Sequence, residues 1–376
     1  MHIVIVNLTS GGVSGGYRKY LQLIVPLLGR DSRVRRLSIF NPPGMRSCSQ
    51  LDTNQPLTWP LNHRWRGYRR LKAQLQELAP DVVFIPTARW LDFGAIPTVV
   101  MLRNMEPLVI PFGGNAYREG LKNVGRRCLA RVSCKRANRV IAVSRYVRDF
   151  LIQRWHVDEK KIGIVYHGIE QPPTVCETIK PSGIDRRNEF PIIFTAGSIR
   201  PARGLEDVIR AVALVRQRGV TLTLLIAGEA GPASARYKEY LVRLTSRLGI
   251  ESQVVWAGEL EPLEMSWCFY HCGAYVMTSR VEACPNTALE AMSHGALCIS
   301  ADNPPMPELF GDAAVYYPST LVEALADRLA TSVLEMSEGE RETLRHAAAR
   351  RARQFSWQRA SDRTIDELLR CVMPEK

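Results

Sequence analysis

Several features that would classify a protein are missing from this 376-residue chain. No apolar run approaches the roughly 18 to 20 residues that are needed to cross a bilayer. The first residues lack the basic start and the long apolar region of a signal peptide, and no internal repeat or low-complexity segment is evident. We therefore expect a cytoplasmic protein, and the length predicts two domains rather than a single core.

Disulfides and metal sites are not indicated either. The nine cysteines are odd in number and lie scattered among apolar neighbours, which is not typical of a disulfide framework. Cys268, His271 and Cys272 form the densest metal-like group, but three candidates without a second pair are more typical of a helix packed against a core. No paired acidic motif of the Asp-x-Asp type occurs. We expect no metal and no tightly bound cofactor.

Acidic residues are scarce in the first half of the chain. Residues 1–180 contain 28 Lys and Arg against 12 Asp and Glu, whereas residues 181–376 contain 22 against 25. Such a positive half attracts anionic membranes and nucleic acids alike, but no nucleic-acid recognition motif accompanies the charge. We expect no nucleic-acid partner.

The segment of residues 61–78 concentrates this charge. It combines Trp65 and Tyr68 with five cations, namely Arg64, Arg66, Arg69, Arg70 and Lys72. Such a helix can rest on anionic headgroups with its rings at the interface, or it can present an ordinary solvated face. The sequence does not decide between a membrane-binding helix and an ordinary surface helix. A second basic run, at residues 126–148, favours a peripheral position on the inner face of a membrane.

Short apolar runs alternate with helical segments along the chain, which is typical of parallel α/β sheets. Ser144 is expected to cap a helix that ends at Trp155. A stretch rich in proline, residues 170–189, predicts the linker between two domains. The predicted strands cover residues 2–8, 34–40, 81–85, 98–102 and 139–143 before the linker, and residues 221–227 and 254–258 after it. Residues 191–215 predict a further strand, a loop with basic residues and a helix.

The stretch of residues 278–300 organises the second half. An apolar run at residues 274–277 predicts a buried strand, residues 286–294 a short helix that Gly295 ends, and residues 297–300 the next strand. At the start of a helix the first backbone N–H groups have no partner within the helix, and the helix dipole favours phosphate oxygens there. The sequence thus predicts an anion site at this helix start.

Two carboxylates flank the predicted anion site. Glu282 lies in the loop before the helix, and Glu290 lies about one turn inside it. A carboxylate accepts hydrogen bonds from hydroxyl groups and repels phosphate, so the pattern favours a molecule with phosphate in the middle and sugars on both sides. A nucleotide sugar has this structure. The alternative is that Glu290 is a solvated helix residue and Glu282 a charge that the helix dipole favours.

The spacing of these glutamates, followed by Ala291, Met292 and Gly295, resembles the signature of the retaining glycosyltransferases of family 4. The resemblance implies the GT-B fold, in which two Rossmann-like doubly wound α/β domains face each other across an interdomain cleft. It further implies that Glu282 contacts the donor sugar and that Glu290 binds the ribose. The diphosphate would be held by the loop and helix start, which comprise Cys284, Pro285, Asn286 and Thr287.

The same resemblance sets the domain boundaries. It implies an acceptor-binding domain at residues 1–180 and a nucleotide-sugar-binding domain at residues 190–357. The terminal helix, residues 358–376, would pack back on the first domain.

Further donor-binding residues follow from the loop with basic residues within residues 191–215. Family members commonly have an arginine where this chain has Ser198 and a lysine where it has Arg203. Arg203 is expected to grip the diphosphate and to assist catalysis, and Arg200 is expected to replace the missing charge. Gly258 would lie beside the base.

Three candidate residues lie in the first half. A glycine-rich turn after the first strand lets backbone approach a ligand, and the resemblance places Gly15 and Gly16 over the donor phosphates; alternatively, they serve only the chain reversal. Asn104 stands where many members have a histidine near the reacting sugar. Asparagine cannot exchange a proton at neutral pH, so we expect it to hold a sugar hydroxyl.

The expected function is transfer of a sugar from a nucleoside diphosphate sugar, with UDP favoured, to a glycan or lipid-linked acceptor with retention of configuration. By resemblance, surface polysaccharide or lipopolysaccharide assembly is the expected pathway. Two alternatives stay open. A nucleotide-sugar epimerase of the same fold would bind the same donor, and a non-catalytic family member would bind it without turnover.

Overall fold

The computed structural model describes residues 1–8, 15–41, 54–56, 64–110, 112–114, 117–184 and 190–373. The chain forms two compact units. The first comprises residues 1–105, 125–168 and 356–376, and the second comprises residues 106–124 and 169–355. Residues 106–124, which the sequence boundaries assign to the N-terminal domain, are therefore grouped with the second unit.

The first unit is built on a parallel sheet of seven strands within the described residues, in the order β3-β2-β1-β4-β5-β6-β7. The central strands are fully buried apolar runs, as expected when helices cover both faces of a parallel sheet. The strands are β1 (His2–Val6), β2 (Arg36–Asn41), β3 (Asn54–Pro56), β4 (Val82–Ile85), β5 (Thr98–Leu102), β6 (Arg139–Ala142) and β7 (Ile162–Ile164).

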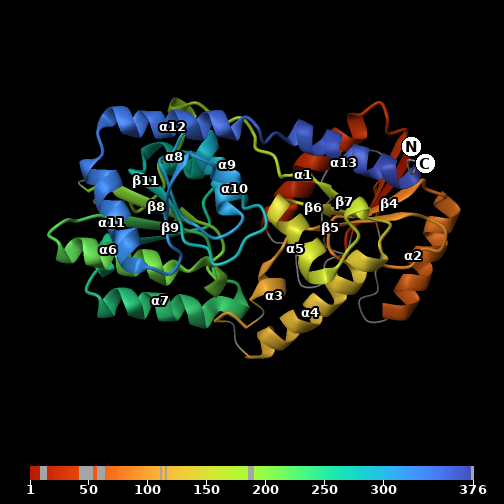
Figure 1. Cartoon of the computed structure of the whole chain (residues 1–376), viewed down its shortest axis with the longest axis horizontal. Coiled ribbons are helices and arrows are strands. Elements are labelled where there is room, and N and C mark those ends of the chain that lie inside the picture. Colours follow the sequence, from red (N-terminus) through yellow and green to blue (C-terminus); the bar gives the residue numbers. More distant parts are fainter. Residues whose placement is uncertain are drawn as a thin grey trace. The chain divides into compact units, whose positions relative to one another are not determined.

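Helices α1 (Gly15–Arg30) and α13 (Trp357–Val372) lie side by side in the first unit (Figure 1). The predicted cap at Ser144 is confirmed, because its hydroxyl accepts a hydrogen bond from the Val147 N–H at the start of α5 (Arg145–Trp155). The first unit also contains α2 (Arg64–Leu78) and the short η1 (Glu159–Lys161). Of α4 (Tyr117–Arg136), residues 117–124 are grouped with the second unit and residues 125–136 with the first.

A buried ion pair ties α13 to the sheet of the first unit. The Arg139 Nε on β6 donates to the Glu367 Oε2 on α13 at 2.9 Å, and the Glu367 side chain is only 6% exposed. The carboxylate also lies directly over β7, since a Cβ on Gly163 would come within 2.1 Å of the Glu367 Cδ. The C-terminal helix is thus held by charge as well as by apolar contact.

The second unit contains a parallel sheet of six strands in its described part, in the order β10-β9-β8-β11-β12-β13. The order reverses between β8 and β11, and ligands of such sheets bind at the carboxyl ends of the strands at this switch point. The strands are β8 (Ile192–Ala196), β9 (Thr223–Ala227), β10 (Val254–Gly258), β11 (Ala274–Met277), β12 (Cys298–Ala301) and β13 (Ala314–Tyr317).

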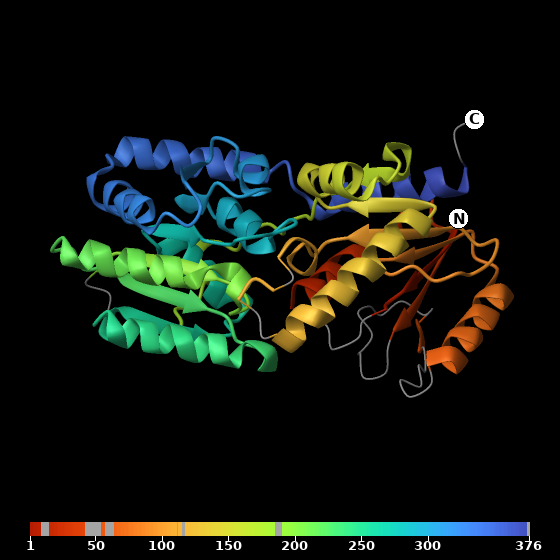
Figure 2. The same ribbon diagram turned by 60° about the horizontal axis from the view of Figure 1, so that its bottom comes forward.

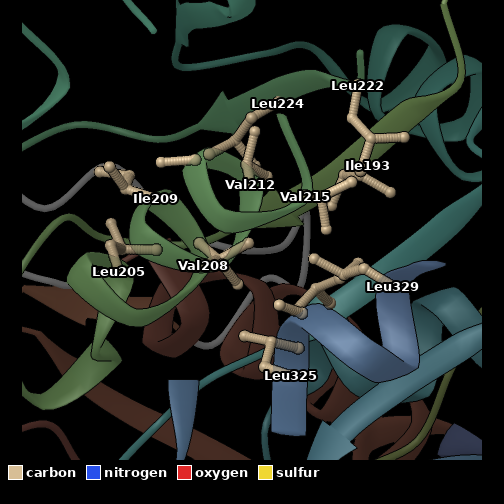
Figure 3. Packing of buried hydrophobic residues seen from close by; sticks show 14 of the residues in the cluster. Ile193, Leu205, Val208, Ile209, Val212, Val215, Leu222, Leu224, Leu325 and Leu329 are labelled. Atoms are coloured by element: carbon tan, nitrogen blue, oxygen red, sulfur yellow. The ribbon is translucent and has the colours of Figure 1, made fainter. Parts of the chain in front are cut away.

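The core of the second unit lies between this sheet and two helices, α6 (Leu205–Gln217) and α11 (Val322–Ala330). Apolar residues recur every three or four positions along α6, which turns one face toward the sheet. Figure 3 shows these side chains packed against Ile193 and Leu224 from the strands and Leu325 and Leu329 from α11. The paired doubly wound fold predicted from the sequence is confirmed.

The second unit contains further helices before, between and after its strands. They are α3 (Glu106–Val109), η2 (Val175–Glu177), η3 (Pro201–Arg203), η4 (Pro232–Ser234), α7 (Ala235–Arg247), η5 (Glu251–Gln253), α8 (Pro262–His271), α9 (Asn286–Ser293), α10 (Met306–Phe310), η6 (Thr331–Glu335) and α12 (Glu338–Ala352).

The metal-like group predicted to be a packed helix lies on α8 and the residue after it. Cys268 is buried, and the His271 ring stacks on Trp267 with 4.4 Å between centroids. Within the described residues, no cluster of His, Cys, Asp and Glu is arranged to hold a metal, and all eight cysteines there are free thiols. No helix in the described part of the chain is long and apolar enough to span a membrane.

We expect Glu367→Gln to lower the stability of the first unit by about 3 kcal/mol, because it leaves the half-buried Arg139 without its anion. The measurement is the midpoint of urea unfolding compared with wild type. Glu338→Gln, which removes an exposed carboxylate from α12, is the matched control. Equal midpoints for the two variants would show that the ion pair does not hold α13.

Candidate functional site

Three strands of the second sheet end in a glycine at the same edge. Gly197 follows β8, Gly228 follows β9 and Gly258 ends β10. The Gly228 N–H donates to the Gly258 carbonyl at 2.6 Å, and a Cβ on Gly228 would lie 2.1 Å from the Gly197 carbonyl oxygen. With φ near +122°, Gly228 also has a backbone conformation that favours glycine. The absence of side chains lets these strand ends pack closely together.

The side chain of Arg203 lies on this glycine edge. It comes from η3, and its Nη2 donates to the Ala196 carbonyl at the end of β8 at 3.0 Å. A Cβ on Gly197 would lie 1.6 Å from the same Nη2, so a side chain at position 197 would force the guanidinium to move. Sequence reasoning did not single out Gly197, although a glycine directly after a buried strand was the available signal.

Arg203 forms an ion pair with Glu282. The Arg203 Nη1 lies 2.8 Å from the Glu282 Oε1, and both side chains are only 12% exposed. The Ser279 hydroxyl donates to the same carboxylate oxygen at 3.0 Å and accepts from the Arg203 Nη1 at 3.1 Å. The structure therefore brings together two residues that are 79 positions apart in the sequence, and adds Ser279, which sequence reasoning missed.

Backbone contacts hold the loops that carry the two charges. The Thr278 hydroxyl donates to the Arg203 carbonyl at 2.7 Å, and the Arg280 N–H donates to the Ala202 carbonyl at 2.8 Å. Gly204 has φ near +61°, and a Cβ there would lie 2.6 Å from the Thr278 carbonyl oxygen. The loop after β8 and the loop after β11 are thus fastened to each other.

A second ion pair stabilises the contact between these two loops. Arg280 binds both carboxylate oxygens of Asp207 on α6, at 2.8 Å for the Nη2, and it lies 3.1 Å from Glu206. Burial acts to lower the pKa of Arg280, but the hydrogen bonds and negative charge of Asp207 and Glu206 outweigh it and raise that pKa. The Tyr237 hydroxyl donates in turn to Glu206. Arg280 therefore has a structural role in positioning the loop that carries Glu282.

The predicted helix after this loop is confirmed as α9, and Gly295 follows its end with φ near +62°. Pro285 occupies the N-cap position without a side-chain cap, so the start of α9 retains its positive dipole end. Cys284 and Pro285 are buried, whereas Asn286, Thr287 and Glu290 are partly exposed. Because Pro285 supplies no side-chain cap, the positive end of the helix dipole favours an anion here.

Arg200 forms an ion pair with a different carboxylate, Glu106. Its Nη1 lies 2.7 Å from the Glu106 Oε2 of α3, so its charge is engaged within the second unit. Ser198 is exposed directly after Gly197. Of the two arginines in this loop, Arg203 is the one that reaches Glu282.

The remaining candidates, Gly15, Gly16 and Asn104, lie in the first unit. The expectation that Gly15 and Gly16 form a turn before the helix is wrong, because α1 begins at Gly15 and both are exposed in its first turn. Glycine is tolerated there because the first turn leaves its N–H groups open to solvent. The preceding pair, Gly11 and Gly12, lies outside the described residues. Asn104 is exposed two residues after β5.

The geometry of the second unit suits a ligand that carries both anionic and hydroxyl groups. A cation and a helix start are available for oxyanions, whereas Glu282 and Glu290 are acceptors for hydroxyl groups. Both kinds of group lie at the carboxyl ends of β8 and β11, at the switch point of the sheet.

Comparison with known families agrees with this arrangement. The model of the glycosyl transferases group 1 matches residues 178–355, and the model of glycosyltransferase family 4 matches residues 46–171. The two matches together cover most of the chain.

Individual relatives are distant. A D-inositol 3-phosphate glycosyltransferase of Streptomyces avermitilis is 24% identical over 244 residues, which are 61% of this chain and 51% of that protein. The chain thus matches about half the length of this relative. HepE of Anabaena, solved in complex with UDP-glucose, has a TM-score of 0.74 at 18% identity, over 98% of this chain and all of that one. WaaG, a glycosyltransferase involved in lipopolysaccharide biosynthesis, has a TM-score of 0.68 at 14% identity, over 96% and 98%.

We expect Gly197→Ala to destabilise the second unit by about 2 kcal/mol more than Gly219→Ala, because the new methyl group must displace the Arg203 guanidinium. Both glycines have positive φ, but a Cβ on Gly219 would meet nothing within 4 Å. Because φ is near +130° at Gly197 and near +85° at Gly219, the difference between the urea unfolding midpoints contains the contact together with the difference in backbone strain. Equal losses in the two variants would contradict the close fit of Arg203 on Gly197.

Proposed function

We propose that this chain, which belongs to the glycosyltransferases of group 1 and family 4, transfers a sugar from a nucleoside diphosphate sugar to an acceptor. The observation that carries the proposal is the Arg203–Glu282 pair beside the start of α9. UDP is the favoured nucleotide, which is supported by the UDP-glucose complex of HepE. The transfer would retain the anomeric configuration, as the family implies.

A residue or backbone segment is proposed to bind each part of the donor. Glu290 accepts hydrogen bonds from the ribose diol, the backbone of Asn286 and Thr287 holds the diphosphate, and Glu282 binds a hydroxyl of the sugar. Gly258 lies beside the base. The partial exposure of Glu282 and Glu290 supports these roles, since a hydroxyl must be able to reach them.

The proposed chemistry is electrostatic. Negative charge develops on the leaving diphosphate, and Arg203 together with the N–H groups at the start of α9 would stabilise it. Losing one such group typically costs about 3 kcal/mol, or roughly 100-fold in rate. Because a protein cation and amides supply this stabilisation, we propose that the reaction needs no metal.

Arg203 is proposed to exchange Glu282 for the diphosphate when the donor binds. The guanidinium that would bind the diphosphate is held by Glu282 at 2.8 Å. A diphosphate carries more negative charge than one carboxylate, so it competes for Arg203 and releases Glu282 toward the sugar hydroxyl. Donor binding and orientation of the sugar would then occur together.

The acceptor is proposed to be a glycan or a lipid-linked glycan, and surface polysaccharide or lipopolysaccharide assembly the pathway. The involvement of WaaG in lipopolysaccharide biosynthesis supports this proposal. Asn104, exposed after β5, is proposed to hold an acceptor or donor hydroxyl.

We also propose a membrane-facing surface on α4, a single uninterrupted helix (Figure 2). Exposed apolar side chains recur along it at Tyr117 (72%), Leu121 (51%), Leu129 (49%) and Val132 (46%). Basic residues are interspersed, namely Arg118, Lys122, Arg126, Arg127, Arg131 and Lys135. Apolar insertion combined with positive charge favours an anionic bilayer surface.

Helix α2, for which the sequence left a membrane role open, supports that role less. Its Tyr68 packs against Phe93 with 6.5 Å between ring centroids and donates a hydrogen bond to the Asp92 carbonyl. That ring is half-buried against the protein, so it is a poor interfacial anchor. Arg69 and Arg70 are exposed and still contribute charge.

Titration calorimetry with UDP, GDP and ADP, without added metal, tests the donor site. We expect one nucleotide to bind in the micromolar range. Glu290→Gln should weaken it about tenfold, because a charge-assisted hydrogen bond to the ribose is lost. Glu282→Gln should not weaken nucleotide binding, since the proposed ligand of Glu282 is the sugar and the diphosphate no longer competes with a carboxylate for Arg203.

Glu323→Gln, an exposed carboxylate on α11, serves as the control and should bind as wild type does. Failure of all three nucleotides to bind would refute the donor site. Interconversion of nucleotide sugars without an acceptor would instead identify an epimerase.

The membrane surface is tested by co-sedimentation with vesicles of phosphatidylglycerol and, separately, of phosphatidylcholine. We expect binding to the anionic vesicles only, weakening as salt rises. The double variant Leu121→Ser, Leu129→Ser should bind at least tenfold less because two apolar anchors are removed. Val242→Ser, an exposed apolar residue on α7, should bind normally. Salt-independent binding, or binding equal in the double variant, would remove α4 from this role.

A further inference from the structure

Arg103 occupies the carboxyl edge of the first sheet, directly after β5. Its guanidinium carbon lies 3.8 Å from the centroid of the Tyr17 ring and 5.7 Å from that of Tyr20, both on α1. The side chain is half-buried, and the two tyrosines beneath it are buried. The first unit thus holds a cation stacked on an aromatic surface at the edge where parallel sheets bind ligands.

This arginine differs from three other buried or partly buried arginines of the protein. Arg139, Arg203 and Arg280 each bind a carboxylate. For Arg103, by contrast, the described residues supply no ion pair and no hydrogen bond to the guanidinium. Burial lowers the pKa of Arg103 to about 10, with the Tyr17 and Tyr20 hydroxyls acting in the opposite direction, so the group stays charged at neutral pH.

The surface under Arg103 is held rigidly. The Tyr17 hydroxyl donates to the Asn7 Oδ1 at 2.7 Å, and the Asn7 amide donates to the Asn41 side chain. Asn7 and Asn41 follow or end β1 and β2 and are buried. This chain of hydrogen bonds fixes the ring, so the stacked guanidinium is oriented before any ligand arrives.

We propose that Arg103, stacked on Tyr17, binds an oxyanion of the acceptor, a phosphate or a carboxylate, so that the enzyme selects an anionic acceptor. The proposal rests on the proposed function and on the expectation, from the family resemblance, that residues 1–180 bind the acceptor. Stacking occupies one face of the guanidinium, and its planar fork of N–H donors matches two oxygens of a phosphate or carboxylate.

A ligand-binding role and a structural role for Arg103 predict different effects on stability. If Arg103 binds a ligand, removing this charge without a counter-ion should leave stability unchanged or raise it. If Arg103 had a structural role, its removal should destabilise the first unit, as the removal of a cation from a buried ion pair does. Arg103→Met keeps most of the apolar stem over Tyr17 and removes the charge. Stability and anion binding should therefore respond differently to this variant.

The experiment is calorimetry on the full chain, first with UDP alone. With UDP at saturation, the chain is then titrated with inorganic phosphate, glucose 6-phosphate, glucuronate and glucose. Vesicles of phosphatidic acid and of phosphatidylcholine form a separate arm, which distinguishes a lipid headgroup from a soluble sugar phosphate. The variants are Arg103→Met, Arg103→Lys and the control Arg30→Met, an exposed arginine at the far end of α1.

We expect at least one anionic probe to bind wild type and Arg30→Met equally and glucose to bind neither. Arg103→Met should lose at least tenfold in that affinity and Arg103→Lys less, because lysine keeps the charge without the fork. UDP affinity and the unfolding midpoint should be unchanged in Arg103→Met, or the midpoint should rise.

Two results would overturn the inference: anionic probes that bind Arg103→Met as tightly as wild type, or no binding of any anionic probe to wild type. A loss of UDP affinity in Arg103→Met would also overturn it, because the arginine would then serve the donor. If wild type does not bind UDP at all, the donor proposal fails instead, and the anion titrations are read without UDP.

Discussion

The proposed donor site depends on the ion pair between Arg203 and Glu282. A guanidinium and a carboxylate that are both largely buried must satisfy each other, because either charge alone would be costly in that environment. The glycine at position 197 permits the pair by leaving space at the end of β8. The second pair, between Arg280 and Asp207, keeps the Glu282 loop against the Arg203 loop. Loss of any of these contacts would move both proposed donor groups together.

The two units use arginine in contrasting ways. In the second unit Arg203 is neutralised by a carboxylate, which a diphosphate can displace. In the first unit Arg103 has an aromatic ring beneath it and no acidic partner among the described residues. An ion pair lowers the cost of burying the charge, whereas a stacked and unpaired charge keeps its donors available. This contrast is the reason for assigning an anionic group to the acceptor as well as to the donor.

Local patterns predicted most of the fold correctly. The strands at residues 98–102 and 274–277 and the cap at Ser144 follow from apolar runs and from hydrogen-bonding chemistry that operate within a few residues. The start of α1 was misjudged, because glycines that resemble a turn can also form an exposed first turn. Residues 106–124 were placed with the first half because sequence continuity does not reveal which core a segment contacts.

The sequence by itself determined the two-sheet α/β architecture, the helix start near Pro285 and the pair of glutamates around it, because these depend on residue spacing along the chain. Only the tertiary structure decided which charges meet. Arg203 joins Glu282 while Arg200 joins Glu106, although the two arginines are three residues apart. Arg103, and not only its neighbour Asn104, emerged as a candidate ligand-binding group. Such pairings depend on the crossover of parallel strands and on the space left by a missing Cβ, and neither is visible in one-dimensional spacing.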